Sequence, residues 1–321
     1  MRRLFAAVTV LALFGAGPGA AHAQAWPAKP IRVVVSSFGS GPDIMARLVG
    51  QKLTEAWGQQ VIVDARVGAS GRIAAEHVAK SAPDGYTLMM VTSQFAIGSA
   101  LFEKLAYDPV RDFAPVALMA STPFVLVVHP SVPARSVREL IALAKARPGQ
   151  LQGGHSGAGS PAALALQRLK SMAGADIADI PFKTIAQSFT DTAAGQIHFT
   201  FSVVPAVLPM VKSGRLRGLA VTSLKRTPLA PELPPIADTL PGYEVIGWYG
   251  LVAPARTSPE IVMRLNSEIV RAMRSADVQE RMVTLGAELS PPASAQEFGA
   301  YLVAQIEQSR QLIRESGARP D

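Results

Sequence analysis

Short apolar runs alternate with stretches of helical periodicity along almost the whole chain, and this alternation limits the possible folds more than any other feature. The apolar runs have the length of β-strands and cover residues 31–35, 60–63, 86–91, 124–128, 177–182, 198–201, 219–222 and 245–252. Between many of them, apolar residues recur at helical spacing, as over residues 73–79, 137–146, 162–172 and 186–194. Strands that alternate with helices form βαβ units, so the sequence predicts an α/β fold with parallel, doubly wound sheets.

The C-terminal third has a different pattern, in which helices follow one another. Ser258 precedes Pro259 and Glu260, which is a typical helix start, and further helices are expected over residues 275–285 and 294–316. We expect these helices to form a tail that packs on the first domain.

The length of the chain favours two domains, because a domain typically has about 100–200 residues. Residues 121–129 and 245–255 are the two segments expected to carry the chain between them. The expected division is a discontinuous first domain, residues 24–123 with 250–321, and a second domain, residues 124–249.

The first 23 residues have the pattern of a secretory signal peptide. Arg2 and Arg3 precede an apolar run, and a small-x-small motif at residues 21–23 fits a cleavage site. We expect cleavage near Ala23 and Gln24 and a mature protein that is soluble in the periplasm. A retained membrane anchor is the less favoured alternative, because a membrane span needs about 20 apolar residues.

The composition excludes several kinds of site. The chain has no cysteine, so disulfides, thiolate metal sites and a cysteine nucleophile are excluded. The histidines lack the paired spacing of a metal site, and we expect neither a metal nor a cofactor. Without Arg2 and Arg3 the chain has 29 basic and 24 acidic side chains, a formal charge of +5. The basic residues are scattered, which argues against nucleic acid and favours small anions as partners.

Three turns rich in glycine and serine each precede a predicted helix. They lie in "SSFGSGPD" (36–43), "VGASGRIAAE" (67–76) and "GGHSGAGSPAALAL" (153–166). Glycine allows the backbone to approach a ligand, and the first turn of a helix offers unpaired N–H groups to an anion. The three turns could converge on one ligand between two domains, or each could be only a tight connection between strand and helix.

Two other interpretations of these turns are weaker. Ile44 occupies the place of the third glycine of a dinucleotide fingerprint, and the chain has no P-loop Gly-Lys-Ser/Thr, so a nucleotide loop is rejected. Gly154-x-Ser156 resembles the nucleophile elbow of a serine hydrolase, although the residues before it make a poor apolar strand. Asp191 and His198 would have to complete the triad only seven residues apart, which leaves a hydrolase as a remote alternative.

Several longer motifs occur in a fixed order along the mature chain. They include "WPAKPIRVVV" (26–35), "APDGYT" (82–87), "YDPVRDFAP" (107–115), "IPFKTIAQSFTDTAAGQI" (180–197) and "GYEVIGWYGLVAPARTSPEIVMRLN" (242–266). With these motifs, the sequence resembles the substrate-binding proteins of tripartite tricarboxylate transporters, the Bug-type periplasmic receptors, over essentially the whole mature chain.

The resemblance implies two α/β domains around a cleft that closes on a small carboxylated solute, which is then passed to a membrane transporter. It also implies that main-chain amides, hydroxyls and ordered water hold the carboxylate, with little part for charged side chains. Carried over by position, the expected ligand-binding residues are Ser36, Ser37, Phe38, Gly39, Ser40, Gly41, Ala69, Ser70, Gly71, Thr92, Ser93, Ser156, Gly157, Ala158, Gly159, Ser160, Phe182, Lys183, Thr184 and Ser202.

The chain departs from the family pattern in the first turn, which is one residue shorter than the usual Pro-Phe-Pro-Pro-Gly-Gly-Ser-Thr-Asp. His198 and Ser202 also stand where relatives often have acidic residues. A second function stays open, in which the receptor senses its ligand and signals to a membrane histidine kinase. For either function we expect a monomer without catalytic residues.

Overall fold

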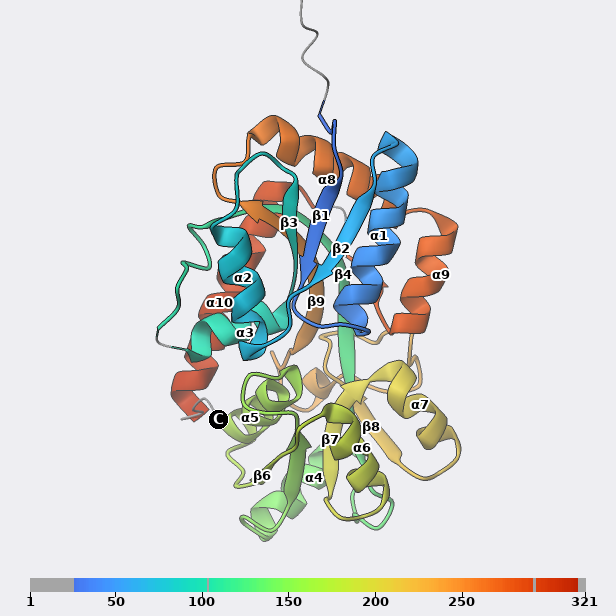
Figure 1. Cartoon of the computed structure of the whole chain (residues 1–321). Helices are drawn as coiled ribbons and strands as arrows, with labels where there is room; N and C mark the ends of the chain where they lie inside the picture. Colours follow the sequence, from blue (N-terminus) through green and yellow to red (C-terminus); the bar gives the residue numbers. More distant parts are fainter. Residues whose placement is uncertain (1–25, 103, 291–292, 317–321) are drawn as a thin grey trace, which may run out of the picture.

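The computed structural model describes residues 26–102, 104–290 and 293–316, and the structural statements below concern these residues. The predicted signal sequence over residues 1–23 lies outside them. Figure 1 shows an upper and a lower lobe, joined at a narrow waist by long strands and flanked by helices.

The upper lobe is built around three parallel strands. β1 (Ile31–Val35) lies between β2 (Val61–Ala65) and β3 (Thr87–Thr92). The helices that follow these strands are α1 (Gly41–Trp57), the short 3-10 helix η1 (Ala69–Gly71) with α2 (Arg72–Ala79), and α3 (Ser93–Leu101). The three strands predicted for this part of the chain are confirmed and differ only at their ends.

The lower lobe repeats the same construction. β5 (Gln152–His155) lies between β6 (Ala178–Pro181) and β7 (Phe199–Val203) and is parallel to both. Its helices are α4 (Val137–Ala146), α5 (Pro161–Ala173), α6 (Ile185–Ala193) and α7 (Val204–Lys212).

Two long strands cross the waist. β4 (Phe113–Val128) pairs with β9 (Ile246–Pro254) and the short β10 (Glu288–Leu289) in its first part, then with β7 and β8 (Arg217–Val221) in its last part. β9 lies between β3 and β4. The ten strands therefore form one sheet that continues from the upper into the lower lobe.

The predicted α/β fold with parallel strands in each lobe is confirmed, but the sheet as a whole is mixed, which the sequence analysis did not predict. β9 is antiparallel to both β3 and β4, and β4 is antiparallel to β7 and β8. β4 runs from the upper to the lower lobe and β9 returns, so these neighbours must run in opposite directions. The alternation of apolar runs indicates where strands lie but not in which direction they run.

Strand β5 is a further difference from the sequence prediction, which expected a poor strand here. Gly153 and Gly154 occupy the positions where apolar side chains would mark a strand, and both are buried. A Cβ atom at Gly153 would lie 2.8 Å from atoms of both Leu166 and Phe199. The strand lacks apolar side chains because its neighbours pack directly onto its backbone.

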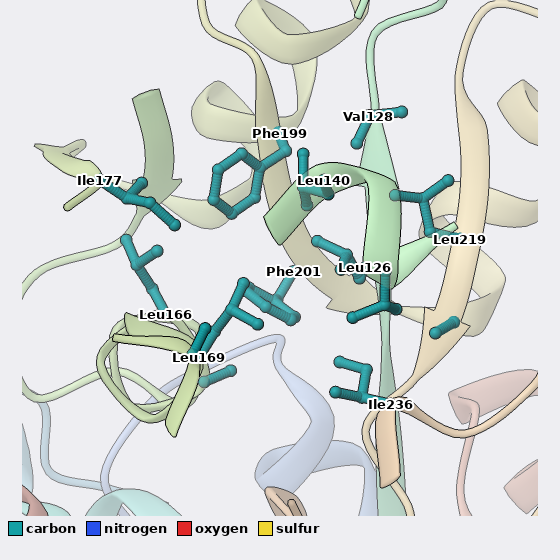
Figure 2. Packing of buried hydrophobic residues seen from close by; sticks show 14 of the residues in the cluster. Leu126, Val128, Leu140, Leu166, Leu169, Ile177, Phe199, Phe201, Leu219 and Ile236 are labelled. Carbon is teal, nitrogen blue, oxygen red and sulfur yellow. The ribbon is translucent and has the colours of Figure 1, made fainter. Parts of the chain in front are cut away.

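The core of the lower lobe lies between α5 and the sheet (Figure 2). Leu166 and Leu169 are three residues apart on α5, and both are fully buried together with Phe199 and Phe201 of β7. Fully burying each such side chain stabilises the fold by about 1.5–3 kcal/mol. This cluster therefore fixes α5, and with it the N-terminal end of the helix, on the sheet.

The C-terminal helices pack on the upper lobe, as the sequence predicts. They are α8 (Pro259–Met273), α9 (Ala276–Leu285) and α10 (Ala295–Ser316). Leu265 and Ile269 of α8 share a buried cluster with Met45 of α1, whereas Phe298 of α10 packs with Val34 on the opposite face of the sheet. Within the described ranges, no helix has an apolar stretch long enough to cross a bilayer.

Candidate functional site

The strands of the upper lobe end at the waist, and helices begin there. In Figure 1, β1 enters at the top of the lobe and runs down toward the lower lobe. β2 and β3 are parallel to β1, so the carboxyl ends of all three strands lie at the same edge. Ligands of open α/β sheets bind at this kind of edge, where the strand order changes direction.

Four of the expected ligand-binding residues line one small hollow at this edge. They are Ser36, Ser70, Gly71 and Thr92. A Cβ atom at position 71 would lie 3.2 Å from the Cβ atom of Ser36 and 3.5 Å from its hydroxyl oxygen. The structure thus brings the first turn, the second turn and the end of β3 together. Their hydroxyl groups and the Arg72 side chain line the hollow beside apolar residues such as Met90 and Phe95.

The second turn contains a run of positive φ angles. Gly68, Ala69, Ser70 and Gly71 have φ angles of 127°, 47°, 53° and 88°. For a residue other than glycine, this conformation costs on the order of 1–3 kcal/mol and concentrates at binding sites. Gly71 is the N-cap of α2 and makes no side-chain cap. The N–H groups of Gly71 and Arg72 donate to the Gly68 and Ala69 carbonyls, so the free donors of this helix start are those that follow Arg72.

The first turn is held by its own hydrogen bonds. The Ser37 and Ser40 hydroxyl oxygens are 2.6 Å apart, and the N–H of Gly39 donates to the Asp43 carboxylate at 3.1 Å. Asp43 is only 3% exposed and forms an ion pair with Arg47 at 3.0 Å. Asp43 lies in the first turn of α1, as expected, and Arg47 balances its charge within the turn.

Tyr249 of β9 contacts this first turn and is a residue that the sequence reasoning missed. A Cβ atom at Gly41 would collide with the Tyr249 hydroxyl, so glycine at the first position of α1 makes room for the phenol. Burial raises the pKa of Tyr249 above its ordinary value, so the hydroxyl, which any tyrosine retains at neutral pH, also stays protonated in more basic solution. Successive side chains of a strand point to opposite faces, so Tyr249 lies on the face opposite the buried Trp248. The almost entirely apolar sequence of β9 gives no signal that marks Tyr249.

Serine and threonine side chains cap α5 and α6 in the lower lobe, as Thr92 caps α3 in the upper lobe. Ser160 Oγ accepts the N–H of Ala163 at 3.2 Å at the start of α5, and Thr184 Oγ1 accepts the N–H of Gln187 at 3.2 Å at the start of α6. The third glycine turn also reaches the upper lobe, since a Cβ atom at Gly159 would lie 3.7 Å from Leu101 of α3. Ser156, Gly157 and Ala158 form the half-buried part of this turn.

The remaining expected residues of the lower lobe have different environments. The Phe182 ring packs over β5, 3.2 Å from where a Cβ atom of Gly154 would lie. Lys183 is exposed, and its ammonium group has no partner in the part of the chain that the structure describes. Ser202 lies within β7 and is only 4% exposed, so little of its side chain is accessible to a ligand.

Ser93 lines a second, separate space. A cavity of about 530 Å³ lies between both lobes and α10, and Ser93, Ser121 and Tyr301 are among its lining residues. In the wall of this cavity, the Thr227 hydroxyl of the lower lobe donates a hydrogen bond to the Glu288 carboxylate of β10. None of the residues that line the small hollow at the strand ends lines this cavity.

The geometry separates Ser156 and His198, two of the three residues of the possible hydrolase triad. His198 Nδ1 accepts the N–H of Gln152 at 3.1 Å, at the start of β5. Ser156 follows the end of that strand, four residues later, and a strand rises about 3.3 Å per residue. The Ser156 hydroxyl is therefore on the order of 13 Å from the His198 ring, too far for proton transfer. Among the described residues, no group of three or more histidine, aspartate and glutamate side chains is placed to hold a metal ion.

The chain is similar to known proteins in sequence. A family model, the tripartite tricarboxylate transporter family receptor, matches residues 45–318. Protein BugT of Bordetella pertussis is 33% identical over 324 residues, which cover 99% of each chain.

Two solved structures with bound acids are also similar. The structure of R. palustris Rpa4515 with adipate has a TM-score of 0.79 and 35% sequence identity, and the match covers 92% of this chain and 100% of that chain. The structure of MatC from Rhodopseudomonas palustris with bound malate has a TM-score of 0.75 and 28% identity, with 90% and 100% covered.

Proposed function

The chain belongs to the family of tripartite tricarboxylate transporter receptors, and from this premise we propose that it captures a carboxylated organic acid between its lobes and delivers it to a membrane transporter. Receptors of this family are solute-binding proteins and not enzymes. The proposal concerns the chemical class of the ligand, the residues that hold it and the partner that receives it.

The observation that carries the proposal is the convergence of Ser36, Ser70, Gly71 and Thr92 at the strand ends of the upper lobe. These residues supply hydroxyl and main-chain donors but no acidic side chain, and α1 and α2 begin beside them without side-chain caps. Such a set of donors suits a carboxylate. Adipate and malate in two similar structures support the same class of ligand.

We place the carboxylate on the turns 36–41 and 68–71, with the loops 156–160 and 182–184 closing from the lower lobe. The proposed domain division stays at residues 24–123 with 250–321 and residues 124–249, so that the ligand lies between the domains. In this proposal the protein acts in the periplasm as a monomer, after cleavage of the signal sequence near Ala23.

A thermal-shift titration with mono-, di- and aromatic carboxylates tests the ligand class. A ligand at about 100 times its dissociation constant should stabilise the folded state by about 2.7 kcal/mol. A broad panel in which no acid changes the melting temperature would refute carboxylate capture.

Chemical crosslinking of the ligand-loaded protein to membranes of its own bacterium tests the partner. We expect crosslinks to the membrane subunits of a transporter that depend on the ligand. Crosslinks to a histidine kinase instead would favour the sensing function and leave the ligand class unaffected.

A further inference from the structure

Phe38, in the first glycine turn, is the most exposed large apolar side chain in the described part of the chain, with 72% of its surface accessible. The turn lies at the lower end of β1 and α1 and faces the lower lobe (Figure 1). An isolated exposed apolar residue needs no explanation, but this one stands on the turn that forms the proposed ligand site.

The exposure of Phe38 does not come from a loose turn. The Gly39 N–H donates to the buried Asp43 carboxylate at 3.1 Å, and the Ser37 and Ser40 hydroxyl oxygens are 2.6 Å apart. Gly39 has a φ angle of +66°, a conformation that directs the chain back toward α1 at no steric cost. The backbone on both sides of Phe38 is therefore fixed, and the ring is presented outward.

The arginines closest in sequence to the two upper turns each have a partner in the upper lobe. Arg47 pairs with Asp43 at 3.0 Å, and Arg66 pairs with Asp64 at 3.1 Å. Arg72 donates to the Ala69 carbonyl at 3.0 Å, and its guanidinium lies 3.9 Å from the centre of the Phe102 ring. A carboxylate held at these turns meets hydroxyl and main-chain donors and the Arg72 side chain, which lines the same hollow. The exposed apolar group that the first turn offers to the rest of the ligand is the Phe38 ring.

We infer that Phe38 contacts the body of the bound acid and selects carboxylates with an alkyl or aryl body over their polyhydroxylated counterparts. The inference rests on the proposed function, because it assumes that the carboxylate lies on the turns 36–41 and 68–71. Hydroxyl groups placed against the ring would lose water without gaining hydrogen bonds, whereas a hydrocarbon body would cover apolar surface.

Two matched pairs of acids test the inference by isothermal titration calorimetry. Adipate and galactarate share one carbon chain and two carboxylates, and benzoate and 3,4,5-trihydroxybenzoate share one ring and one carboxylate. We expect that the hydroxyl-free member binds at least about tenfold more tightly in each pair that binds, and that Phe38→Ala reduces this ratio to about threefold or less. Phe38→Leu should retain most of it.

Met263→Ala is the matched control, because Met263 of α8 is 61% exposed and lies outside the turns; it should leave the ratio unchanged. A wild-type preference for the hydroxylated acids overturns the inference, and so does an equal loss for both members of a pair in Phe38→Ala. Binding of these or other carboxylates would still support the proposed function in either case. If no carboxylate binds at all, the proposed function itself fails.

Discussion

The upper and the lower lobe both carry glycine- and serine-rich turns before helices, but the two sets of turns use their helix ends differently. In the upper lobe, the two glycine-rich turns lead into α1 after Ser40 and into α2 after Gly71, and neither residue caps its helix with a side chain. Thr92, which follows no such turn, does cap α3, because its Oγ1 accepts the N–H of Gln94. In the lower lobe, Ser160 and Thr184 accept backbone N–H groups of α5 and α6. When a side chain caps a helix, one of the free N–H groups at the helix end is hydrogen-bonded within the chain and is no longer available to a ligand.

A turn rich in glycine and serine is therefore not by itself an anion site. Of two turns with similar composition, the one with the uncapped helix retains more backbone donors for a ligand. We therefore assign carboxylate binding to the upper turns and closure to the lower turns. The following substitutions test this difference between the turns, and those with the largest expected effect come first.

Gly71→Val should reduce affinity for the best carboxylate by about a hundredfold or more, as measured by isothermal titration calorimetry. Gly71 has a φ angle of +88°, which a β-branched residue adopts only with strain, and its Cβ atom would meet Ser36 at 3.2 Å. A loss of about 2.7 kcal/mol corresponds to this factor.

Gly214→Val is the control for Gly71→Val. Gly214 has a φ angle of +73° and no atom within 4 Å of its Cβ position, so the substitution introduces similar strain away from the proposed site. We expect lower stability with retained affinity. Equal losses of affinity in both variants would show that strain, and not the second turn, controls binding.

Gly41→Ala should weaken binding by about tenfold, because overpacking typically costs about 1–3 kcal/mol and the new methyl group would collide with the Tyr249 hydroxyl. Displacement of the α1 N-terminus is the expected cause. Tyr249→Phe removes the hydroxyl, so the double variant should regain most of the affinity. A double variant that binds no better than Gly41→Ala alone would contradict this account of the contact.

Ser36→Ala should lower affinity by about threefold to tenfold with little change in melting temperature, because a net hydrogen bond contributes about 0.5–1.5 kcal/mol. The Ser36 hydroxyl lies in the small hollow beside Gly71. Unchanged affinity in calorimetry would remove this hydroxyl from the ligand.

Ser160→Ala is the matched substitution in the lower lobe and should show the opposite behaviour. Loss of a helix cap costs typically about 1 kcal/mol, which for a chain of this size lowers the melting temperature by roughly 2 °C. Affinity should stay within about twofold of the wild type. A clear loss of affinity at constant melting temperature would mean that both lobes bind the ligand in the same way.

Much of the fold follows from sequence periodicity, and the failures have identifiable physical causes. The strands β1, β2 and β3 carry apolar runs, so the pattern predicts them. β5 was missed because Gly153 and Gly154 replace the side chains that would mark it. The direction of β9 was missed because it depends on which lobe the chain is leaving. This is set by the course of the whole chain and not by the local sequence pattern.

The candidate site could be predicted only in its local parts. The turns around Ser36, Gly71 and Ser160 are visible as glycine and serine before a helix start. The contact between Gly41 and Tyr249 joins residues that are far apart in the sequence, and no local pattern reveals it. Whether a hydroxyl caps its own helix or faces the ligand is likewise decided by the three-dimensional position of the turn.

The position of β9 has a consequence for how the chain folds. β9 comes from the last quarter of the sequence, yet it lies in the interior of the sheet, between β3 and β4. The upper lobe therefore cannot complete its sheet until residues 246–254 are available, and pairings between such distant segments form slowly. For a chain that is exported, as we propose, this arrangement delays completion of the upper sheet until most of the polypeptide has been made.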